Sequence, residues 1–199
     1  VGSNEQDLMG LAPELDRRFF VVSVRAPITL QAGAYAWFHV QFTPNGFLIE
    51  PSEAEESRQA LLKFVDEAVE EYGLDPNRVY LMGFSQGCII SLSAALTMPK
   101  KFAGVVAMSG RILPDIVAKI AGRDETKGLP VLLLHGTEDT VIPISHGRNS
   151  REILEDKMVD LEYHEYRMGH YVSPESMFDI KEWLRSRLDQ GSDWRRVSV

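Results

Sequence analysis

A serine between two glycines follows directly on an apolar run of the sequence. Residues 83–87 read Gly-Phe-Ser-Gln-Gly; residues 78–84 are typical of a strand, and the apolar run from Gln86 to about Thr97 is typical of a buried helix. A serine at a sharp strand-to-helix turn is forced outward, and small residues two positions to either side relieve the crowded backbone. The helix also directs free N–H groups and its positive dipole end toward an oxyanion beside Ser85. We therefore predict that Ser85 is a nucleophile; a glycine-rich turn that only packs helix on strand would need no general base elsewhere.

A candidate acid and a candidate base follow the serine, each just after a predicted strand. A serine hydroxyl needs an imidazole to take its proton and a carboxylate to hold that imidazole. The apolar strand at residues 131–134 runs into a loop that contains Glu138 and Asp139, and the sequence alone permits either as the acid. The strand at residues 161–167 ends just before His170. Because parallel strands end at the same edge of a sheet, His170 is the expected base.

The other four histidines have ordinary structural explanations. His135 follows a buried strand and is expected to make a structural hydrogen bond near the site, while His39 lies in an aromatic loop, on the surface or in a pocket. His146 and His164 fall within helix and strand patterns and are expected on the surface. The sequence contains no set of His, Cys, Asp and Glu at metal-ligand spacing and no glycine-rich phosphate loop. We therefore expect neither a metal nor a cofactor.

Strand-like runs alternate with helical patterns along the chain, which indicates an α/β fold with a mostly parallel central sheet flanked by helices. Residues 19–24 are predicted to be a buried strand, followed by a loop from Ala26 to about Pro51. The clearest helix follows, with Ser52 and Glu55 as a capping box. The length of 199 residues fits one domain, which we place at residues 1–189, with a polar tail at residues 190–199.

Composition excludes several classes of protein. The chain is 44% hydrophobic and 25% charged, which is ordinary for a globular protein. Its formal charge of −8 gives no general attraction for nucleic acid, and no apolar run is long enough to span a membrane. The single cysteine, Cys88, has no partner within the chain, which suits a reducing compartment. We expect a cytoplasmic protein without stable membrane insertion and without a nucleic-acid partner.

At these motifs the sequence resembles the phospholipase/carboxylesterase family, the small α/β-hydrolases that include bacterial carboxylesterases and acyl-protein thioesterases. The resemblance covers nearly the whole chain and rests on these segments: residues 2–8, 36–38, 83–87, 135–143 and 169–170. It implies an α/β-hydrolase fold without a large cap domain, and it places the acid at Asp139 rather than Glu138.

The resemblance also implies an oxyanion hole made by two backbone N–H groups. One belongs to Gln86, and the other lies in an N-terminal glycine loop, where Val1 occupies the donor position. In the family a buried strand ending in His-Gly comes just before this loop, beside the nucleophile strand. The sequence begins inside that motif. We therefore expect the natural protein to carry residues ahead of Val1.

The expected function is that of a serine carboxylesterase acting on short- to medium-chain carboxylic esters through an acyl-enzyme on Ser85. Trp37, Phe38 and Ile142 are candidate walls of the acyl pocket, with ordinary core packing as the alternative for each. An acyl-protein thioesterase or a lysophospholipase with the same triad is the nearest alternative. A catalytically silent hydrolase fold that acts as a binding protein is a more remote one. The expected partner is a small-molecule ester, and pairing into a homodimer is left open.

Overall fold

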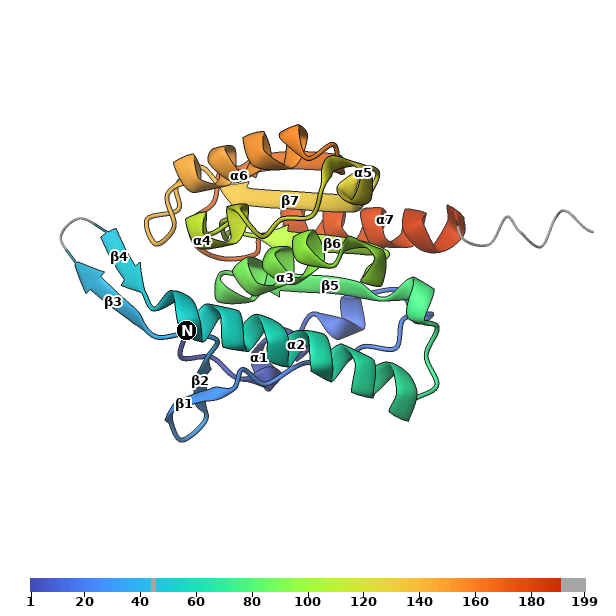
Figure 1. The fold of residues 1–199 in the computed structure, drawn as a ribbon, viewed down its shortest axis with the longest axis horizontal. Helices are drawn as coiled ribbons and strands as arrows, with labels where there is room; N and C mark the ends of the chain where they lie inside the picture. The colour runs from blue at the N-terminus through green and yellow to red at the C-terminus, as the bar shows by residue number, and fades with distance from the viewer. Residues whose placement is uncertain (44–45, 191–199) are drawn as a thin grey trace, which may run out of the picture.

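The computed structural model describes residues 1–43 and 46–190 and is built around a four-stranded parallel sheet (Figure 1). The strands are β5 (Tyr80–Phe84), β6 (Gly104–Met108), β7 (Pro130–Gly136) and β8 (Asp160–Tyr166), and they lie side by side in this order. One row of the register runs through Leu81, Val105, Val131 and Leu161. The strands predicted at residues 78–84, 131–134 and 161–167 are confirmed within a few residues as β5, β7 and β8.

Helices cover both faces of the sheet, which explains why its central strands are apolar without alternation. Figure 1 shows α3 (Gln86–Thr97) in front of the sheet with α2 (Pro51–Glu71) next to it, below β5, and α7 (Pro174–Gln190) behind the sheet. A further helix, α6 (Ile144–Asp156), covers β7 and β8. Every residue of β6 is buried, because alternate side chains enter opposite cores.

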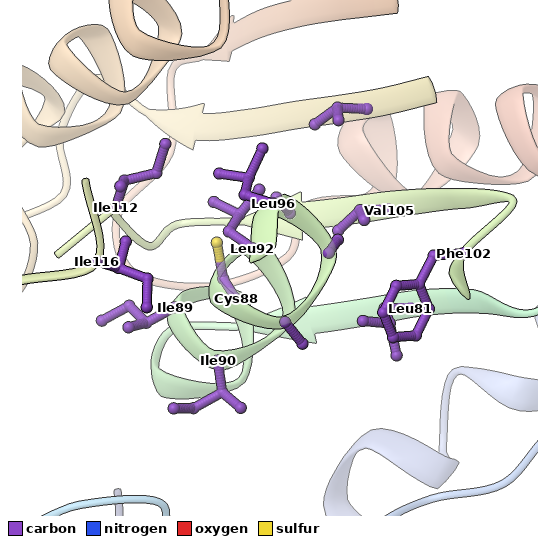
Figure 2. Close-up of a cluster of buried hydrophobic side chains, with 14 of the residues drawn as sticks. Leu81, Cys88, Ile89, Ile90, Leu92, Leu96, Phe102, Val105, Ile112 and Ile116 are labelled. Carbon is purple, nitrogen blue, oxygen red and sulfur yellow. The ribbon is translucent and has the colours of Figure 1, made fainter. Parts of the chain in front are cut away.

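The core on the α3 side is the larger of the two. Val105 of β6 and Leu133 of β7 belong to it, together with Leu92 and Leu96 of α3. Figure 2 shows these two leucines, with Val105 and Ile112, in that cluster. The opposite core is formed by intervening residues of β6 and β7 with α7, which contributes Met177, Ile180, Trp183 and Leu184.

Short elements fill the connections between these units. They are the helices α1 (Glu5–Met9), α4 (Pro114–Val117) and α5 (Arg123–Thr126), and the single-turn helices η1 (Ala12–Glu14), η2 (Pro76–Arg78) and η3 (Pro99–Lys101). The segment predicted to be a loop from Ala26 to Pro51 instead contains two antiparallel hairpins. These are β1 (Ile28–Gln31) with β2 (Ala34–Ala36), and β3 (Val40–Thr43) with β4 (Gly46–Ile49).

The strand predicted at residues 19–24 is wrong for this structure. The segment is irregular, and Phe20 is 58% exposed. Among the residues that the structure describes, no strand pairs with β5 on the side away from β6. The Phe19 ring contacts the Tyr80 ring of β5, with centroids 5.8 Å apart, and a cavity of about 560 Å³ is lined by this segment and by Tyr80 and Leu81. A strand forms only where its backbone N–H and C=O groups find partners on a neighbouring strand. An apolar composition does not by itself provide such partners.

The capping box predicted for α2 is also wrong. The helix begins at Pro51, so Glu50 is its N-cap, and no side chain caps it. The Ser52 hydroxyl donates to the Glu50 carboxylate at 3.0 Å, and the Glu55 carboxylate accepts from the Arg58 guanidinium. Proline is favoured at the first helical position because its missing N–H is not needed there, and this moves the start of the helix.

Two further expectations concern the tail and the membrane. The tail at residues 190–199 lies outside the described residues except for Gln190, which ends α7. Across residues 1–43 and 46–190, no helix has the length and apolar character needed to cross a bilayer.

Candidate active site

Ser85 lies at the sharp turn between β5 and α3, where the sequence predicted it. Its backbone has φ 54° and ψ −117°, a conformation that non-glycine residues rarely adopt. The Ser85 N–H donates to Met108 O of β6 at 2.9 Å, and its carbonyl accepts from Ile89 N of α3 at 3.1 Å. These two bonds hold the strained residue between strand and helix, at the carboxyl edge of the sheet. Strain of this kind is typical of functional sites.

The two glycines beside Ser85 are not equivalent. A Cβ atom on Gly83 would lie 2.3 Å from the carbonyl carbon and oxygen of Gly87 and 2.6 Å from the amide nitrogen of Cys88. A Cβ atom on Gly87 would meet nothing within 4 Å. The close approach of β5 to α3 therefore requires glycine at position 83 only, although the sequence motif suggested crowding at both.

The structure brings Ser85, His170 and Asp139 into one hydrogen-bonded line. The Ser85 hydroxyl lies 2.9 Å from His170 Nε2, and His170 Nδ1 lies 2.7 Å from Asp139 Oδ2. The histidine follows β8 and the aspartate follows β7, so both loops leave the same edge of the sheet as the serine. The Asp139 side chain is fully buried, and His170 keeps a small exposed fraction. An acceptor carboxylate on Nδ1 places the imidazole proton there and leaves Nε2 free to accept the serine proton.

The buried environment of Asp139 distinguishes it from its neighbour Glu138. Asp139 Oδ1 accepts the backbone N–H groups of Val141 at 2.9 Å and Ile142 at 2.8 Å, which leaves Oδ2 to His170. The Glu138 side chain is 58% exposed and accepts from Arg167 at 2.9 Å. The geometry therefore places Asp139 in the line with His170 and leaves Glu138 on the surface.

His135 supports the loop that carries Asp139. Its Nε2 atom lies 2.8 Å from the Ile142 carbonyl and 3.7 Å from Asp139 Oδ2, in a fully buried position. Burial lowers the pKa of His135, so the neutral ring donates its Nε2 proton to the Ile142 carbonyl. A Cβ atom on Gly147 would come within 2.6 Å of His135 Nδ1, so α6 approaches this ring closely. The structural hydrogen bond expected for His135 is confirmed.

The remaining histidines take no part in the line. His39 is exposed and its Nδ1 lies 2.9 Å from Glu53, while His164 Nε2 lies 2.9 Å from Glu162. His146 is half-buried rather than fully exposed, and burial lowers its pKa. No group of three or more His, Cys, Asp and Glu that could hold a metal occurs among the described residues.

The two predicted oxyanion donors, Gln86 and Val1, differ in their positions relative to Ser85. Gln86 is the first residue of α3, so its N–H has no partner within the helix and lies directly beside Ser85. Val1 lies on the side of the sheet's carboxyl edge (Figure 1). The next residue, Gly2, donates its N–H to Tyr35 O at 2.9 Å with φ 78°. The oxyanion role of both donors stays a prediction.

The three predicted pocket residues have different positions. Trp37 is half-buried and lines a cavity of about 240 Å³ together with Gly83 and Gly87. Phe38 is 0% exposed and belongs to the core on the α3 side, so its side chain is core packing rather than a pocket wall. Ile142 is 3% exposed, and its backbone holds Asp139 and His135.

Sequence reasoning missed the side chain of Gln86. Its Oε1 accepts the Trp37 N–H at 3.0 Å, and its Nε2 donates to the Phe38 carbonyl at 2.7 Å. The Ser57 hydroxyl of α2 also donates to the Trp37 carbonyl. These contacts join residues separated by 20 to 49 positions, and no local pattern indicates them.

Together these groups can carry out acyl transfer. A serine hydroxyl, an imidazole in contact with it, a buried carboxylate behind the imidazole and a helix N-terminus beside the serine are the elements of nucleophilic catalysis at a carbonyl.

Comparisons with known proteins agree with this chemistry. Residues 7–188 match the phospholipase/carboxylesterase family. Acyl-protein thioesterase 1 of Kluyveromyces lactis is 30% identical over 159 residues, covering 77% of this chain and 69% of the relative. Carboxylesterase SOBER1 of Arabidopsis thaliana is 29% identical over 173 residues, covering 83% and 75%. The crystal structure of esterase PE8 is similar with a TM-score of 0.80 at 27% identity, covering 93% of this chain and 87% of that one. The carboxylesterase of Bacillus cereus shares the fold, with a TM-score of 0.79 at 24% identity, covering 94% and 84%.

Proposed function

Because the chain belongs to the phospholipase/carboxylesterase family of α/β-hydrolases, we propose that it is a serine carboxylesterase that hydrolyses short- to medium-chain carboxylic esters. The observation that carries the proposal is the line from the Ser85 hydroxyl through His170 to Asp139, with distances of 2.9 and 2.7 Å. A serine that only packed helix on strand would need neither partner.

In the first half of the reaction, the Ser85 oxygen attacks the ester carbonyl carbon while His170 Nε2 takes the hydroxyl proton. Asp139 keeps the other ring proton on Nδ1 and stabilises the imidazolium that forms. The negative charge on the former carbonyl oxygen is stabilised by the Gln86 N–H and by a second backbone donor, for which Val1 is our candidate. The ester C–O bond then breaks, and the alcohol leaves with the proton from His170.

In the second half, water replaces the alcohol. His170 takes a proton from water, whose oxygen attacks the acyl-enzyme carbonyl, and the bond to Ser85 breaks as the proton returns to the serine oxygen. The carboxylic acid leaves and the site is restored. No cofactor enters any step.

The preference for small esters is supported by the short loops around the site. The loops after β5, β7 and β8 supply the three residues without a cap domain among the described residues. Of the three predicted wall residues, Trp37 is half-buried and stays the candidate, because Phe38 and Ile142 are both buried.

An acyl-protein thioesterase is the second candidate, because relatives such as the Kluyveromyces lactis protein carry that name. A thioester would pass through the same acyl-enzyme on Ser85, with a thiol as the leaving group. Comparing kcat/KM for p-nitrophenyl butyrate, an S-acylated peptide and a lysophospholipid separates the candidates, since our proposal requires the ester to be preferred.

The direct test is hydrolysis of p-nitrophenyl acetate and butyrate by the wild type and by Ser85→Ala. We expect ester hydrolysis by the wild type and only background hydrolysis by the variant. A folded wild type without activity on these esters would refute the proposal and leave two alternatives: a thioesterase or lysophospholipase with the same triad, and a silent hydrolase fold that acts as a binding protein.

A further inference from the structure

We propose that the side chain of Gln86 is a positioning residue, which fixes residues 37–39, here called the strap, against the residue that supplies the oxyanion N–H. This inference rests on the proposed esterase function and assigns the Gln86 carboxamide a role separate from that of the Gln86 backbone. The backbone N–H lies beside Ser85, whereas the carboxamide reaches a segment that is almost 50 residues away in the sequence.

Both ends of the carboxamide are used, and both partners belong to the strap. Gln86 Oε1 accepts the Trp37 N–H at 3.0 Å and Gln86 Nε2 donates to the Phe38 carbonyl at 2.7 Å. The Gln86 residue is 6% exposed, so water does not readily replace these bonds. Buried polar groups that lose a partner keep their full desolvation cost, and the pairing therefore defines one arrangement of strap and helix.

The strap has further fixed points on α2. The Ser57 hydroxyl donates to the Trp37 carbonyl, and Glu53 accepts the His39 N–H at 2.7 Å. Three side chains from two helices thus bind the backbone of three consecutive residues. A segment without regular hydrogen bonds of its own is held in register by these side chains, with the Phe38 ring anchored in the core.

The consequence concerns the geometry of the reacting atoms. Gln86 is the first residue of α3 and follows Ser85 directly, so a shift of its side chain moves the peptide that carries the oxyanion N–H. Trp37 lines a cavity together with Gly83 and Gly87, the two glycines that flank the Ser85 turn, so the same shift changes the packing against that turn; Ser85 and His170 do not line this cavity. Displacements of about 1 Å at a reacting centre lower rates by up to about 100-fold.

The test uses variants that keep the backbone N–H at position 86 and change only the side chain. Gln86→Met keeps a similar length and loses both hydrogen bonds. Gln86→Glu keeps the acceptor for Trp37 and loses the donor for Phe38. Gln59→Met is the matched control, because Gln59 is an exposed glutamine of α2 that donates to Glu55 at 3.0 Å and lies outside the strap contacts. The readouts are kcat and KM for p-nitrophenyl butyrate, with active sites counted by endpoint labelling with a fluorophosphonate.

We expect kcat per labelled site to fall by about 10- to 100-fold in Gln86→Met, with a smaller change in KM, and to stay at the wild-type value in Gln59→Met. We expect the kcat of Gln86→Glu, taken relative to that of the wild type, to recover as the pH falls from about 8 to about 6. A buried carboxyl takes up a proton in this range and so regains the missing donor. This recovery is the second readout if Gln86→Met does not fold.

Two results would overturn the inference. A merely structural role predicts fewer labelled sites with an unchanged kcat per site in both Gln86 variants. A flat ratio of Gln86→Glu to wild-type kcat across the pH range would exclude the donor to Phe38 as the functional contact. If the wild type itself neither hydrolyses the ester nor takes up the label, the proposed function fails, which is a distinct outcome.

Discussion

Replacing Gly83 with alanine should damage both the stability and the activity of the protein, whereas the same change at Gly87 should not. A Cβ atom at position 83 would lie 2.3 Å from backbone atoms of Gly87, against roughly 3.5–4.0 Å for an ordinary carbon contact. The strand β5 and the helix α3 would therefore have to separate by more than about 1 Å. The obstructing atoms are backbone atoms, so no side-chain rotation relieves the clash.

The magnitude follows from that displacement. Overpacking of a well-packed interior costs about 1–3 kcal/mol, and a shift of about 1 Å at Ser85 lowers kcat by up to about 100-fold. Position 87 has free space for a Cβ atom and lies within α3, where alanine is favoured over glycine by up to about 1 kcal/mol. We therefore expect Gly87→Ala to unfold at the same or a slightly higher urea concentration than the wild type.

The assay combines urea unfolding of both variants with kcat for p-nitrophenyl butyrate per fluorophosphonate-labelled site. The reasoning is refuted if Gly83→Ala matches the wild type in both measurements. It is equally refuted if Gly87→Ala loses as much stability as Gly83→Ala, because the two positions would then be crowded alike.

Three further predictions test the surroundings of the serine. Asp139→Asn should lower kcat by about 10⁴-fold, because the amide presents the wrong tautomer to the imidazole, while Glu138→Gln should stay within about twofold of the wild type; the reverse order in kinetic assays would contradict the assignment. Burial lowers the pKa of His135, so below about pH 6.5 the unfolded chain binds a proton at this residue that the native state does not bind. The free energy of unfolding should therefore fall as the pH drops below about 6.5. An unchanged pH slope in urea unfolding of His135→Gln would contradict this. Ser109 has φ 47° and a buried hydroxyl without a hydrogen-bond partner among the described residues. Ser109→Gly should therefore leave the free energy of unfolding unchanged or raise it by up to about 1 kcal/mol. A loss of more than about 1 kcal/mol in urea unfolding would show that the hydroxyl has a role.

The positions of Ser85, Asp139 and His170 were predictable because each depends on local order along the chain. Each residue follows a recognisable apolar strand, and parallel strands bring their carboxyl ends to one edge. The choice between Asp139 and Glu138 was not a local matter. It depends on which side chain turns inward to accept the Val141 and Ile142 N–H groups, and the resemblance to the family supplied that choice before the structure did.

Features that depend on distant partners could not be predicted in the same way. The Gln86 carboxamide binds residues 37 and 38, and a motif of five residues does not show where that segment lies. Residues 19–24 have the composition of a strand. Strand formation also needs backbone hydrogen bonds to a neighbouring strand, and among the described residues this segment pairs with none. At α2, the proline at position 51 determined the start of the helix, and the pattern of Ser52 and Glu55 was coincidental.

The measurement that tests the central claim most directly is the site of covalent labelling by a fluorophosphonate, mapped by mass spectrometry of peptides. The wild type should carry one label on Ser85, and His170→Ala, which keeps the serine but removes its base, should label far more slowly. A label on another residue, or equal labelling rates in the wild type and His170→Ala, would contradict the account, because Ser85 would then not be activated by the line of residues described here.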